Sequence, residues 1–445
     1  MSELFGTDGV RGVANRELTA ELAFRIGRAG AFHLMKKGEG RGIVIGKDTR
    51  ISGDMLEGAL SAGICSVGMD VLRVGIMPTP AVAHLTSYLK AAAGVVISAS
   101  HNPIADNGIK FFSSKGFKLP DELERRIEET ILAEDHLPRP EGADIGRVIE
   151  VEHAHEMYLH YIKRMLSGDF SGLRIVLDCA FGAAFFIAPR LFKEMGAEVI
   201  ALHADPDGSR INVDCGATRP KMLQEAVISH GADVGIAFDG DADRVIAVDE
   251  KGEIVNGDKI MAIFAADFAG NNKLPHDLVV STVMSNLGLE KALEEIGVHL
   301  ARTAVGDRYV LEEMLKSGAR LGGEQSGHII LLDYNTTGDG IVTAVHLIRI
   351  LRDRKTTLSE LTKSFRTYPQ ILVNVPASRK DEWRLDDVIQ QAVREVEKRL
   401  KGRGRLVIRP SGTEPLLRIM AEGPDEEELN REIGELAGIV RSRLE

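Results

Sequence analysis

Residues 43–74 read IVIGKDTRISGDMLEGALSAGICSVGMDVLRV and contain a complete strand–helix–strand pattern. Short apolar, β-branched runs at 43–45 and 71–74 predict two strands. Between them, residues 54–68 have the pattern of a helix that ends on a glycine, with Ser52 as a candidate N-cap. This alternation predicts a mainly parallel sheet that is covered by helices on both faces.

The same alternation continues along most of the chain, and the tail changes to strand pairs with two amphipathic helices. We therefore expect an α/β protein with three tandem mixed-sheet α/β domains and a C-terminal α+β domain. Further strands are predicted at 94–97, 173–177, 198–200, 234–238, 278–280, 300–303, 372–375, 405–408 and 416–420. The expected domains are 1–152, 153–254, 255–368 and 369–445.

Size and composition restrict the class of protein. With 445 residues, the chain exceeds what one hydrophobic core usually supports. A net charge of −11 argues against a nucleic-acid-binding protein, because no broad basic field is available. The three cysteines are far apart and in no metal-ligand spacing, so we expect reduced thiols. No run approaches the roughly 18 apolar residues of a membrane span, and the first residues do not resemble a signal peptide. We expect a cytoplasmic protein that binds no membrane.

A serine loop follows the predicted strand at 94–97. Its sequence is Ala99-Ser100-His101-Asn102-Pro103, with Asn-Gly-Ile-Lys at 107–110. Turn-forming residues after a strand place Ser100 at the carboxyl edge of the sheet, where ligands bind in open α/β sheets. An exposed serine hydroxyl there could carry a phosphoryl group.

Two other interpretations of this loop stay open. His101 beside Ser100 suggests a serine hydrolase, but no Gly-x-Ser-x-Gly elbow surrounds the serine and nothing joins His101 to an orienting carboxylate. Alternatively, Ser-His-Asn-Pro is only a turn and Lys110 an ordinary solvated lysine. In the phosphoryl-transfer interpretation, Lys110 stabilises phosphoryl oxygens, or moves a proton if its pKa is lowered.

An acidic loop, Asp239-Gly240-Asp241-Ala242-Asp243-Arg244, follows the predicted strand at 234–238. Three carboxylates at alternate positions repel one another unless a cation lies among them. Oxygen ligands of this kind suit Mg²⁺ or Ca²⁺. A phosphate approaching such a site needs additional positive charge, for which Arg244, Lys110 and Arg11 are candidates.

A calcium-binding EF-hand loop is a weaker match to the same residues. Glu250 falls at position twelve, but Arg244 occupies position six, where an EF-hand has glycine, and the flanks are predicted strands. A solvated charge cluster at a strand end is a further alternative, although the alternation with small residues argues against it.

Two polar loops lie further along the chain. Gly322-Gly323-Glu324-Gln325-Ser326-Gly327-His328 could bind two vicinal hydroxyls through Glu324 and Ser326, or could be a glycine-rich hairpin with incidental polar residues. Arg409-Pro410-Ser411-Gly412-Thr413-Glu414-Pro415 combines a forked donor, two hydroxyls and a free backbone, which favours a phosphate site over a plain turn.

In their order, these motifs resemble the α-D-phosphohexomutase superfamily over essentially the whole chain. The resemblance rests on FGTDGVRG at 5–12 and on the loops around Ser100, Asp239, Glu324 and Arg409. Within the superfamily, GEQSGH at 323–328, AVGDRYV at 304–310 and the opening segment are most similar to the bacterial phosphoglucosamine mutases.

This resemblance implies four domains around a central cleft, with one major loop from each. It implies that Ser100 is phosphorylated and completes a site for one Mg²⁺ per chain with Asp239, Asp241 and Asp243. Glu324 and Ser326 would hold the sugar O3 and O4. The candidates for binding the phosphate that is not transferred are Arg409, Ser411, Gly412, Thr413 and Arg418. The candidates for moving charge or protons are Lys110, Arg11, His101 and His328.

The implied reaction is the conversion of glucosamine 6-phosphate to glucosamine 1-phosphate, a precursor for peptidoglycan. It would pass through a glucosamine 1,6-bisphosphate intermediate, and glucose or glucosamine 1,6-bisphosphate would act as activator. The implied partner is a hexosamine phosphate, and a homodimer is left open. The alternatives are a phosphomannomutase or phosphoglucomutase, a sugar-phosphate sensor without catalysis, and a calcium-stabilised structural protein.

Overall fold

The computed structural model describes residues 4–6, 8–35, 40–411 and 415–445. The chain divides into two compact units. The larger comprises residues 1–282 and 301–362, and the smaller comprises residues 283–300 and 363–445. Among the described residues, no helix is both long and apolar enough to cross a membrane.

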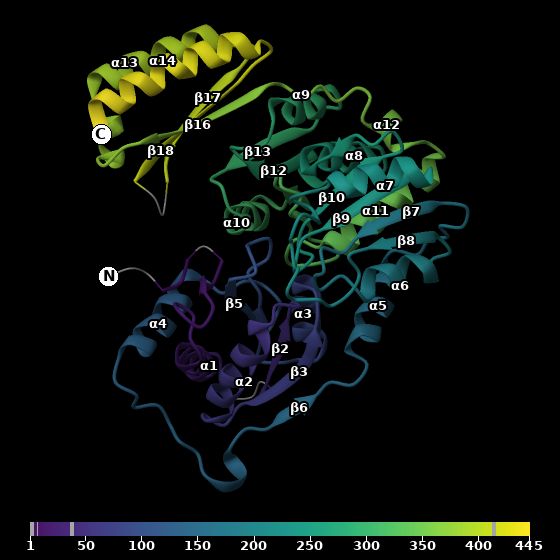
Figure 1. Cartoon of the computed structure of the whole chain (residues 1–445), viewed down its shortest axis with the longest axis vertical. Helices are drawn as coiled ribbons and strands as arrows, with labels where there is room; N and C mark the ends of the chain where they lie inside the picture. Colours follow the sequence, from purple (N-terminus) through teal and green to yellow (C-terminus); the bar gives the residue numbers. More distant parts are fainter. Residues whose placement is uncertain (1–3, 7, 36–39, 412–414) are drawn as a thin grey trace. The chain divides into compact units, whose positions relative to one another are not determined.

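The first sheet of the larger unit has six strands in the order β1-β5-β4-β2-β3-β6 (Figure 1). The strands predicted at 43–45, 71–74 and 94–97 are confirmed, and they pair in parallel. The sheet is mixed, as expected: β2, β3, β4 and β6 pair in parallel, whereas β5 at one side runs antiparallel to both β4 and β1. The strands are β1 Val10–Val13, β2 Gly42–Lys47, β3 Asp70–Ile76, β4 Ala93–Ile97, β5 Asp106–Ser113 and β6 Val148–Glu150.

Helices cover both faces of this sheet, as the alternation predicts. Ile43 and Ile45 share one core with α1, α2 and α4, whereas Gly46 faces Val82 on α3. Burying each isoleucine completely contributes about 1.5–3 kcal/mol. The helices are α1 Ala20–Leu34, α2 Ser52–Cys65, α3 Thr79–Tyr88 and α4 Asp121–Leu132.

The N-cap prediction for α2 is wrong. Ser52 is the first helical residue, and Ile51 precedes it without a side-chain cap. The Ser52 hydroxyl instead accepts a hydrogen bond of 2.9 Å from Asn107 Nδ2, so it is used to hold the beginning of β5.

The second sheet places the acidic loop. Its order is β11-β10-β9-β7-β8, with β7 parallel to its neighbours β8 and β9, and β9 antiparallel to β10. The acidic loop is therefore the connection between two adjacent antiparallel strands. The strands are β7 Arg174–Asp178, β8 Glu198–Leu202, β9 Val234–Phe238, β10 Val245–Asp249 and β11 Ile254–Val255. The helices are α5 Ala154–Met165, α6 Ile187–Glu194 and α7 Lys221–His230.

The third sheet has the order β13-β12-β14-β15, and the Glu324 loop is the turn of its β14–β15 hairpin. The strands are β12 Leu278–Thr282, β13 His299–Thr303, β14 Leu321–Gly323 and β15 Ile329–Leu331. The helices of this segment are α8 Gly257–Gly270, α10 Asp307–Ser317, α11 Gly340–Arg354 and α12 Leu358–Leu361, with α9 Leu287–Glu295 in the smaller unit.

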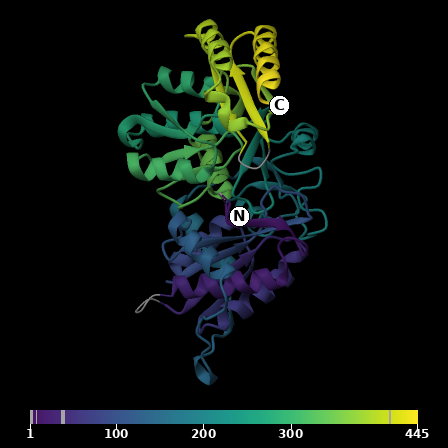
Figure 2. The same cartoon turned by 90° about the vertical axis from the view of Figure 1, so that its left-hand side faces the viewer.

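The smaller unit contains an antiparallel sheet in the order β16-β18-β17, built from β16 Gln370–Pro376, β17 Arg405–Pro410 and β18 Leu416–Glu422. Two helices, α13 Asp387–Leu400 and α14 Glu426–Leu444, pack on it and on each other, and Figure 2 shows the same elements from another side. The stripes predicted for these helices are confirmed as core residues: Ile389, Val393, Val396, Leu400, Leu429, Ile433, Leu436 and Val440. The tail is thus an α+β domain.

Candidate active site

Ser100 lies in the turn between β4 and β5, at the carboxyl end of β4. It adopts a left-handed backbone conformation with a φ of 51°. The expectation of an exposed hydroxyl is wrong, because Ser100 is only 1% exposed. Its hydroxyl donates a hydrogen bond of 2.6 Å to Asp239 Oδ2. The structure therefore brings the serine loop and the acidic loop, which are far apart in the sequence, into direct contact.

The acidic loop is buried together with all three of its carboxylates. Asp239, Asp241 and Asp243 are 1%, 0% and 5% exposed, and each offers an oxygen within 4.8 Å of the others. Ala242 has a left-handed φ of 57°. A Cβ on Gly240 would lie 2.6 Å from the Ser100 carbonyl oxygen, so only glycine lets the two loops approach so closely.

The donor set fits a hard divalent cation. Burial and the neighbouring Asp243 and Asp241 raise the pKa of the Asp239 carboxyl well above its ordinary value. Within the described part of the chain, Asp241 Oδ1 and Asp243 Oδ1 are buried and accept no hydrogen bond. Such atoms carry a desolvation cost that coordination would remove. Carboxylate oxygens without soft ligands match Mg²⁺ or Ca²⁺ better than zinc.

Lys110 lies on β5 and reaches into the acidic loop. Its Nζ lies 3.0 Å from Asp8 Oδ2 and 3.2 Å from Asp241 Oδ2. Burial lowers the pKa of this lysine, but the charges of Asp241, Asp8 and Asp243 outweigh burial and raise it above its ordinary value. The expectation of a solvated lysine is therefore wrong. The raised pKa of Lys110 disfavours a proton shuttle, which needs a lowered pKa, and favours a role as a positive charge.

Two other expected cations lie beside these carboxylates. Arg11 forms an ion pair with Asp8 and lies 3.5 Å from Asn102 Oδ1. The side chain of Arg244 lies 3.8 Å from Asp243. Asp8 and Asp243 therefore each have an arginine nearby in addition to Lys110.

His101 lies next to the serine hydroxyl. Its Nδ1 is 3.3 Å from Ser100 Oγ. Burial, together with the nearby Arg244, lowers the pKa of His101 to about 4, so the ring is neutral at neutral pH. No described carboxylate is hydrogen-bonded to this ring, and the orienting group that a serine hydrolase requires is missing from the described residues.

The Glu324 hairpin contributes one side chain to this cluster. His328 is 2% exposed, with Nδ1 3.6 Å from Asp243 Oδ2 and Nε2 3.4 Å from Asp307 Oδ2. Burial lowers its pKa, but Asp243, Asp307 and Glu324 raise the pKa of His328 to about 9 overall. Glu324 is partly buried and accepts from the Gly306 amide, whereas Ser326 is exposed.

The expected phosphate residues lie in the smaller unit. Arg409 on β17 is directly opposite Arg418 on β18, and Ser411, which follows the end of β17, is buried. Burial and the charge of Arg418 lower the pKa of Arg409. Two guanidinium groups at opposed positions favour an anion between them. Gly412 and Thr413 lie outside the described residues.

Several polar residues of the site were not predicted. The Thr79 hydroxyl donates to Asp241 Oδ2 at 2.6 Å, and Asn212 Nδ2 donates to the Ser100 carbonyl at 2.9 Å. Asp48 and Arg50 follow β2. Arg50 donates hydrogen bonds to Asp48 and to the Ser100 carbonyl of the serine loop. A signal was available for Asp48 and Arg50, because they come directly after a predicted strand, at the edge where ligands bind.

Asp8 was also not singled out as a site residue. It contacts Arg11, Lys110 and Lys118, and Lys118 also lies 2.5 Å from Asp307 Oδ2. Its only signal was its place in the opening motif at 5–12.

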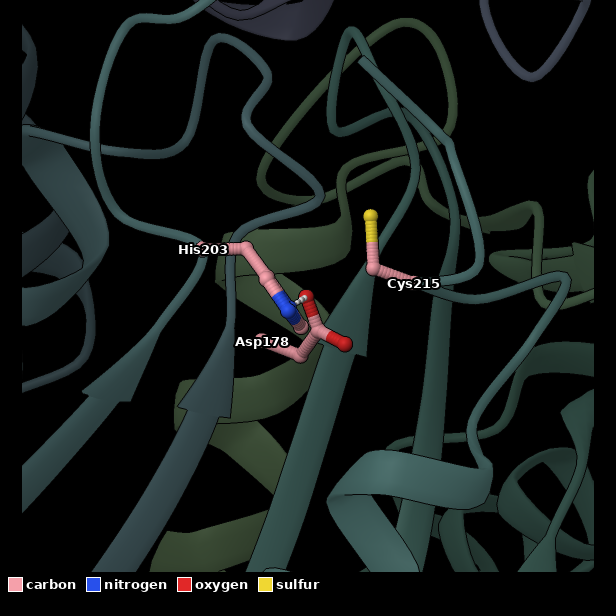
Figure 3. A group of neighbouring side chains, drawn as sticks. All are labelled: Asp178, His203 and Cys215. Carbon is pink, nitrogen blue, oxygen red and sulfur yellow. Dashed lines mark hydrogen bonds and ion pairs between the residues drawn. The ribbon is translucent and has the colours of Figure 1, made fainter. Parts of the chain in front are cut away.

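A second group with metal-binding residue types, Asp178, His203 and Cys215, is explained by hydrogen bonds. Asp178 accepts from His203 Nδ1 at 2.9 Å (Figure 3). It also accepts from the Ala180 amide at 2.9 Å and from the Gly216 amide at 2.8 Å. Burial and Asp178 raise the pKa of the Cys215 thiol to about 12, which disfavours a thiolate ligand. The cysteines are free, as expected.

Comparisons with known proteins match the whole chain. Family models of phosphoglucomutase/phosphomannomutase match in four parts: the alpha/beta/alpha domains I, II and III at residues 2–137, 156–252 and 256–368, and the C-terminal domain at 372–439. A relative from Carboxydothermus hydrogenoformans named phosphoglucosamine mutase is 56% identical over 441 residues, which covers 99% of each chain.

Solved structures agree on the fold. A phosphoglucomutase/phosphomannomutase family protein from Burkholderia thailandensis has a TM-score of 0.85 at 25% identity, covering 100% of this chain and 99% of that one. An Aspergillus fumigatus N-acetylphosphoglucosamine mutase, solved with GlcNAc-6P and magnesium, has a TM-score of 0.70 at 19% identity, covering 98% and 95%.

Proposed function

Because the chain belongs to the phosphoglucomutase/phosphomannomutase family, we propose that it interconverts glucosamine 6-phosphate and glucosamine 1-phosphate, using Ser100 as phosphoryl carrier. The observation that carries the chemistry is the 2.6 Å hydrogen bond from Ser100 Oγ to Asp239 Oδ2 in a buried group of three carboxylates. The choice of glucosamine is supported by relatives named phosphoglucosamine mutase at 55–59% identity.

We propose Asp239, Asp241, Asp243 and the phosphate of Ser100 as ligands of one Mg²⁺. The two buried carboxylate oxygens without hydrogen bonds support this assignment. A bound magnesium ion would neutralise the carboxylates and withdraw charge from the phosphoryl oxygens. Asp241 Oδ2 also accepts a hydrogen bond from the Thr79 hydroxyl. This bond fixes the carboxylate and therefore the orientation of Oδ1.

In the first half-reaction, a sugar hydroxyl attacks the phosphorus on Ser100. The new bond joins this sugar oxygen to phosphorus, and the bond from phosphorus to Ser100 Oγ breaks. The sugar hydroxyl loses its proton to a base, and Ser100 Oγ takes up a proton to become a hydroxyl. The bisphosphorylated sugar then turns, and Ser100 Oγ attacks its other phosphate while its own proton leaves to a base. The old ester bond breaks, and the released sugar oxygen takes up a proton. After both half-reactions Ser100 again carries a phosphate, and the number of bound protons is unchanged.

The charge states of Lys110, His101 and His328 suit these residues to different roles. Lys110 stays protonated because Asp241, Asp8 and Asp243 hold its proton, so it stabilises phosphoryl oxygens. His101 is neutral and lies 3.3 Å from Ser100 Oγ, which suits it to accept a proton at Nδ1. His328 lies between Asp243 and Asp307, so we assign it to fixing the acidic loop.

Binding of the sugar is assigned to the two remaining loops. Glu324 and Ser326 would hold the vicinal hydroxyls O3 and O4, since a half-turn of the ring roughly exchanges these positions. Arg409, Ser411, Gly412, Thr413 and Arg418 would hold the phosphate that is not transferred, and the opposed arginines support this. The domain boundaries, a cytoplasmic location and a homodimer stay predictions.

A coupled assay tests the proposal with glucosamine, glucose and mannose 1-phosphates as competing substrates, with Mg²⁺ and glucose 1,6-bisphosphate present. We expect the largest kcat/KM for glucosamine phosphate. A clear preference for mannose or glucose would assign the chain to a phosphomannomutase or phosphoglucomutase function instead. Binding without turnover of any of the three would favour the sensor alternative.

A further inference from the structure

Arg50 is a buried arginine whose side-chain donors converge on the serine loop. It lies directly after β2, and its side chain is 0% exposed. Its two terminal nitrogens donate to four main-chain carbonyls of this loop: Ser100 at 3.0 Å, Asn102 at 2.7 Å, Pro103 at 2.5 Å and Asp106 at 3.0 Å. One planar group therefore fixes the path of the chain from the serine to the beginning of β5.

Asp48 connects this arginine to the other side of Ser100. Its Oδ2 accepts from Arg50 Nε at 3.0 Å and from the Ser98 hydroxyl at 2.6 Å. Ser98 Oγ in turn accepts from the Ser100 amide at 2.9 Å. Both main-chain polar groups of Ser100 are thus connected to the Asp48–Arg50 pair, the carbonyl directly and the amide through Ser98.

The conformation that these contacts hold is unfavourable for serine. A residue with a side chain rarely adopts a left-handed φ such as the 51° of Ser100, and it does so only where its surroundings impose it. This conformation places the hydroxyl 2.6 Å from Asp239. None of the hydrogen bonds of Arg50 in the described structure involves Ser100 Oγ, so Arg50 does not engage the reacting oxygen.

We propose that Arg50, supported by Asp48 and Ser98, is the positioning residue that holds Ser100 in line with the acidic loop while its oxygen gains and loses a phosphoryl group. The inference rests on the proposed function. A main-chain clamp suits this chemistry, because the side chain changes charge and volume in every cycle while the backbone must stay in place. Small errors in the position of a reacting atom lower the rate steeply.

The substitution Arg50→Lys tests the proposal, because lysine keeps the charge but cannot reach four carbonyls from one planar group. Arg28→Lys is a matched control. Arg28 is 2% exposed and likewise holds a loop, donating to Asp135 and to the carbonyls of Leu137 and Pro138. Both changes should lower the melting temperature.

Only Arg50→Lys should lower kcat, by roughly tenfold or more, with KM within about twofold of wild type. Single-turnover transfer from phosphorylated enzyme to sugar should slow by the same factor as kcat. An unchanged kcat in Arg50→Lys, or an equal loss of kcat in Arg28→Lys, would overturn the proposal.

Ser98→Ala provides a second variant if Arg50→Lys does not fold. It removes the acceptor for the Ser100 amide and leaves the bonds of Arg50 in place. We expect a loss of kcat in the same single-turnover step, and an unchanged rate would count against the clamp. A wild-type protein without mutase activity would reject the proposed function itself. An active wild type whose kcat does not change on substitution of Arg50 would reject only the role of Arg50.

Discussion

The hydroxyl of Ser100 donates a hydrogen bond of 2.6 Å to Asp239, a residue 139 positions later in the chain. The two residues come from separate sheets, at the ends of β4 and β9. Their contact brings a candidate phosphoryl carrier to the edge of a group of carboxylates that repel one another. The chemistry proposed for this chain depends on a cation that makes this arrangement stable.

Magnesium should stabilise the protein through the acidic loop. Addition of Mg²⁺ at about 100 times its dissociation constant to chelator-treated protein should stabilise the fold by about 2.7 kcal/mol. Differential scanning fluorimetry measures the effect. Asp241→Asn should remove most of the response, whereas Asp207→Asn, in a separate turn, should keep it. Equal responses of both variants would contradict the assignment of the site.

Removal of the Lys110 charge should destabilise the protein. Lys110→Met leaves Asp241 buried without this partner, which costs about 3–5 kcal/mol for a broken buried pair. Asp8 is partly exposed and keeps Arg11 and Lys118 as partners. Urea unfolding in the presence of chelator measures this loss. Mg²⁺ should recover part of it, because the cation neutralises the same carboxylates. A loss below about 1 kcal/mol would show that these carboxylates do not need the lysine.

The opposed arginines of the smaller unit should act on substrate binding. Arg409→Ala and Arg418→Ala are each expected to raise the KM for glucosamine 6-phosphate by roughly tenfold, since a charge-assisted hydrogen bond contributes about 1.5–3 kcal/mol. Steady-state kinetics measures the change. Arg431→Ala, at an exposed position of α14, is the control and should behave as wild type. A KM that does not move in either variant would place the phosphate elsewhere.

Stability should fall on acidification because of a buried histidine. Burial, together with Arg349, lowers the pKa of His346 to about 3, and its ring packs edge-on against Phe264 and Phe268. The folded state therefore binds fewer protons than the unfolded state between pH 3 and 6.5. The contribution of neutral His346 to the free energy of unfolding is fully present above pH 6.5. It decreases as the pH falls and is about 2 kcal/mol smaller at pH 5.

His346→Leu should flatten this dependence between pH 6.5 and 5. Urea unfolding of both proteins at several pH values measures the difference in slope. The same slope in wild type and variant would mean that His346 does not titrate as its burial implies.

The sequence predicted those parts of the site that follow a strand directly. Ser100 after β4 and Asp239 after β9 were found because a buried apolar run ending in small and polar residues is a local pattern. The helix stripes of the C-terminal domain were found for the same reason, since Ile389 and Leu429 belong to periodic patterns.

The missing parts depend on distant partners. β5 begins with Asp-Asn-Gly, which has low strand propensity, so its antiparallel place beside β4 was not recognised. Burial of Lys110 follows from that pairing. The contacts of Lys118 with Asp8 and Asp307 bridge three segments, and no local pattern predicts them.

The modification of Ser100 is the most direct test of the central claim. Intact-mass analysis should be performed on wild type and on Ser100→Ala after incubation with glucose 1,6-bisphosphate and Mg²⁺. We predict an additional mass of about 80 Da on wild type, lost on addition of excess glucosamine 6-phosphate, and no such adduct on the inactive variant. Full activity of wild type without the adduct, or an active Ser100→Ala protein, would contradict the account.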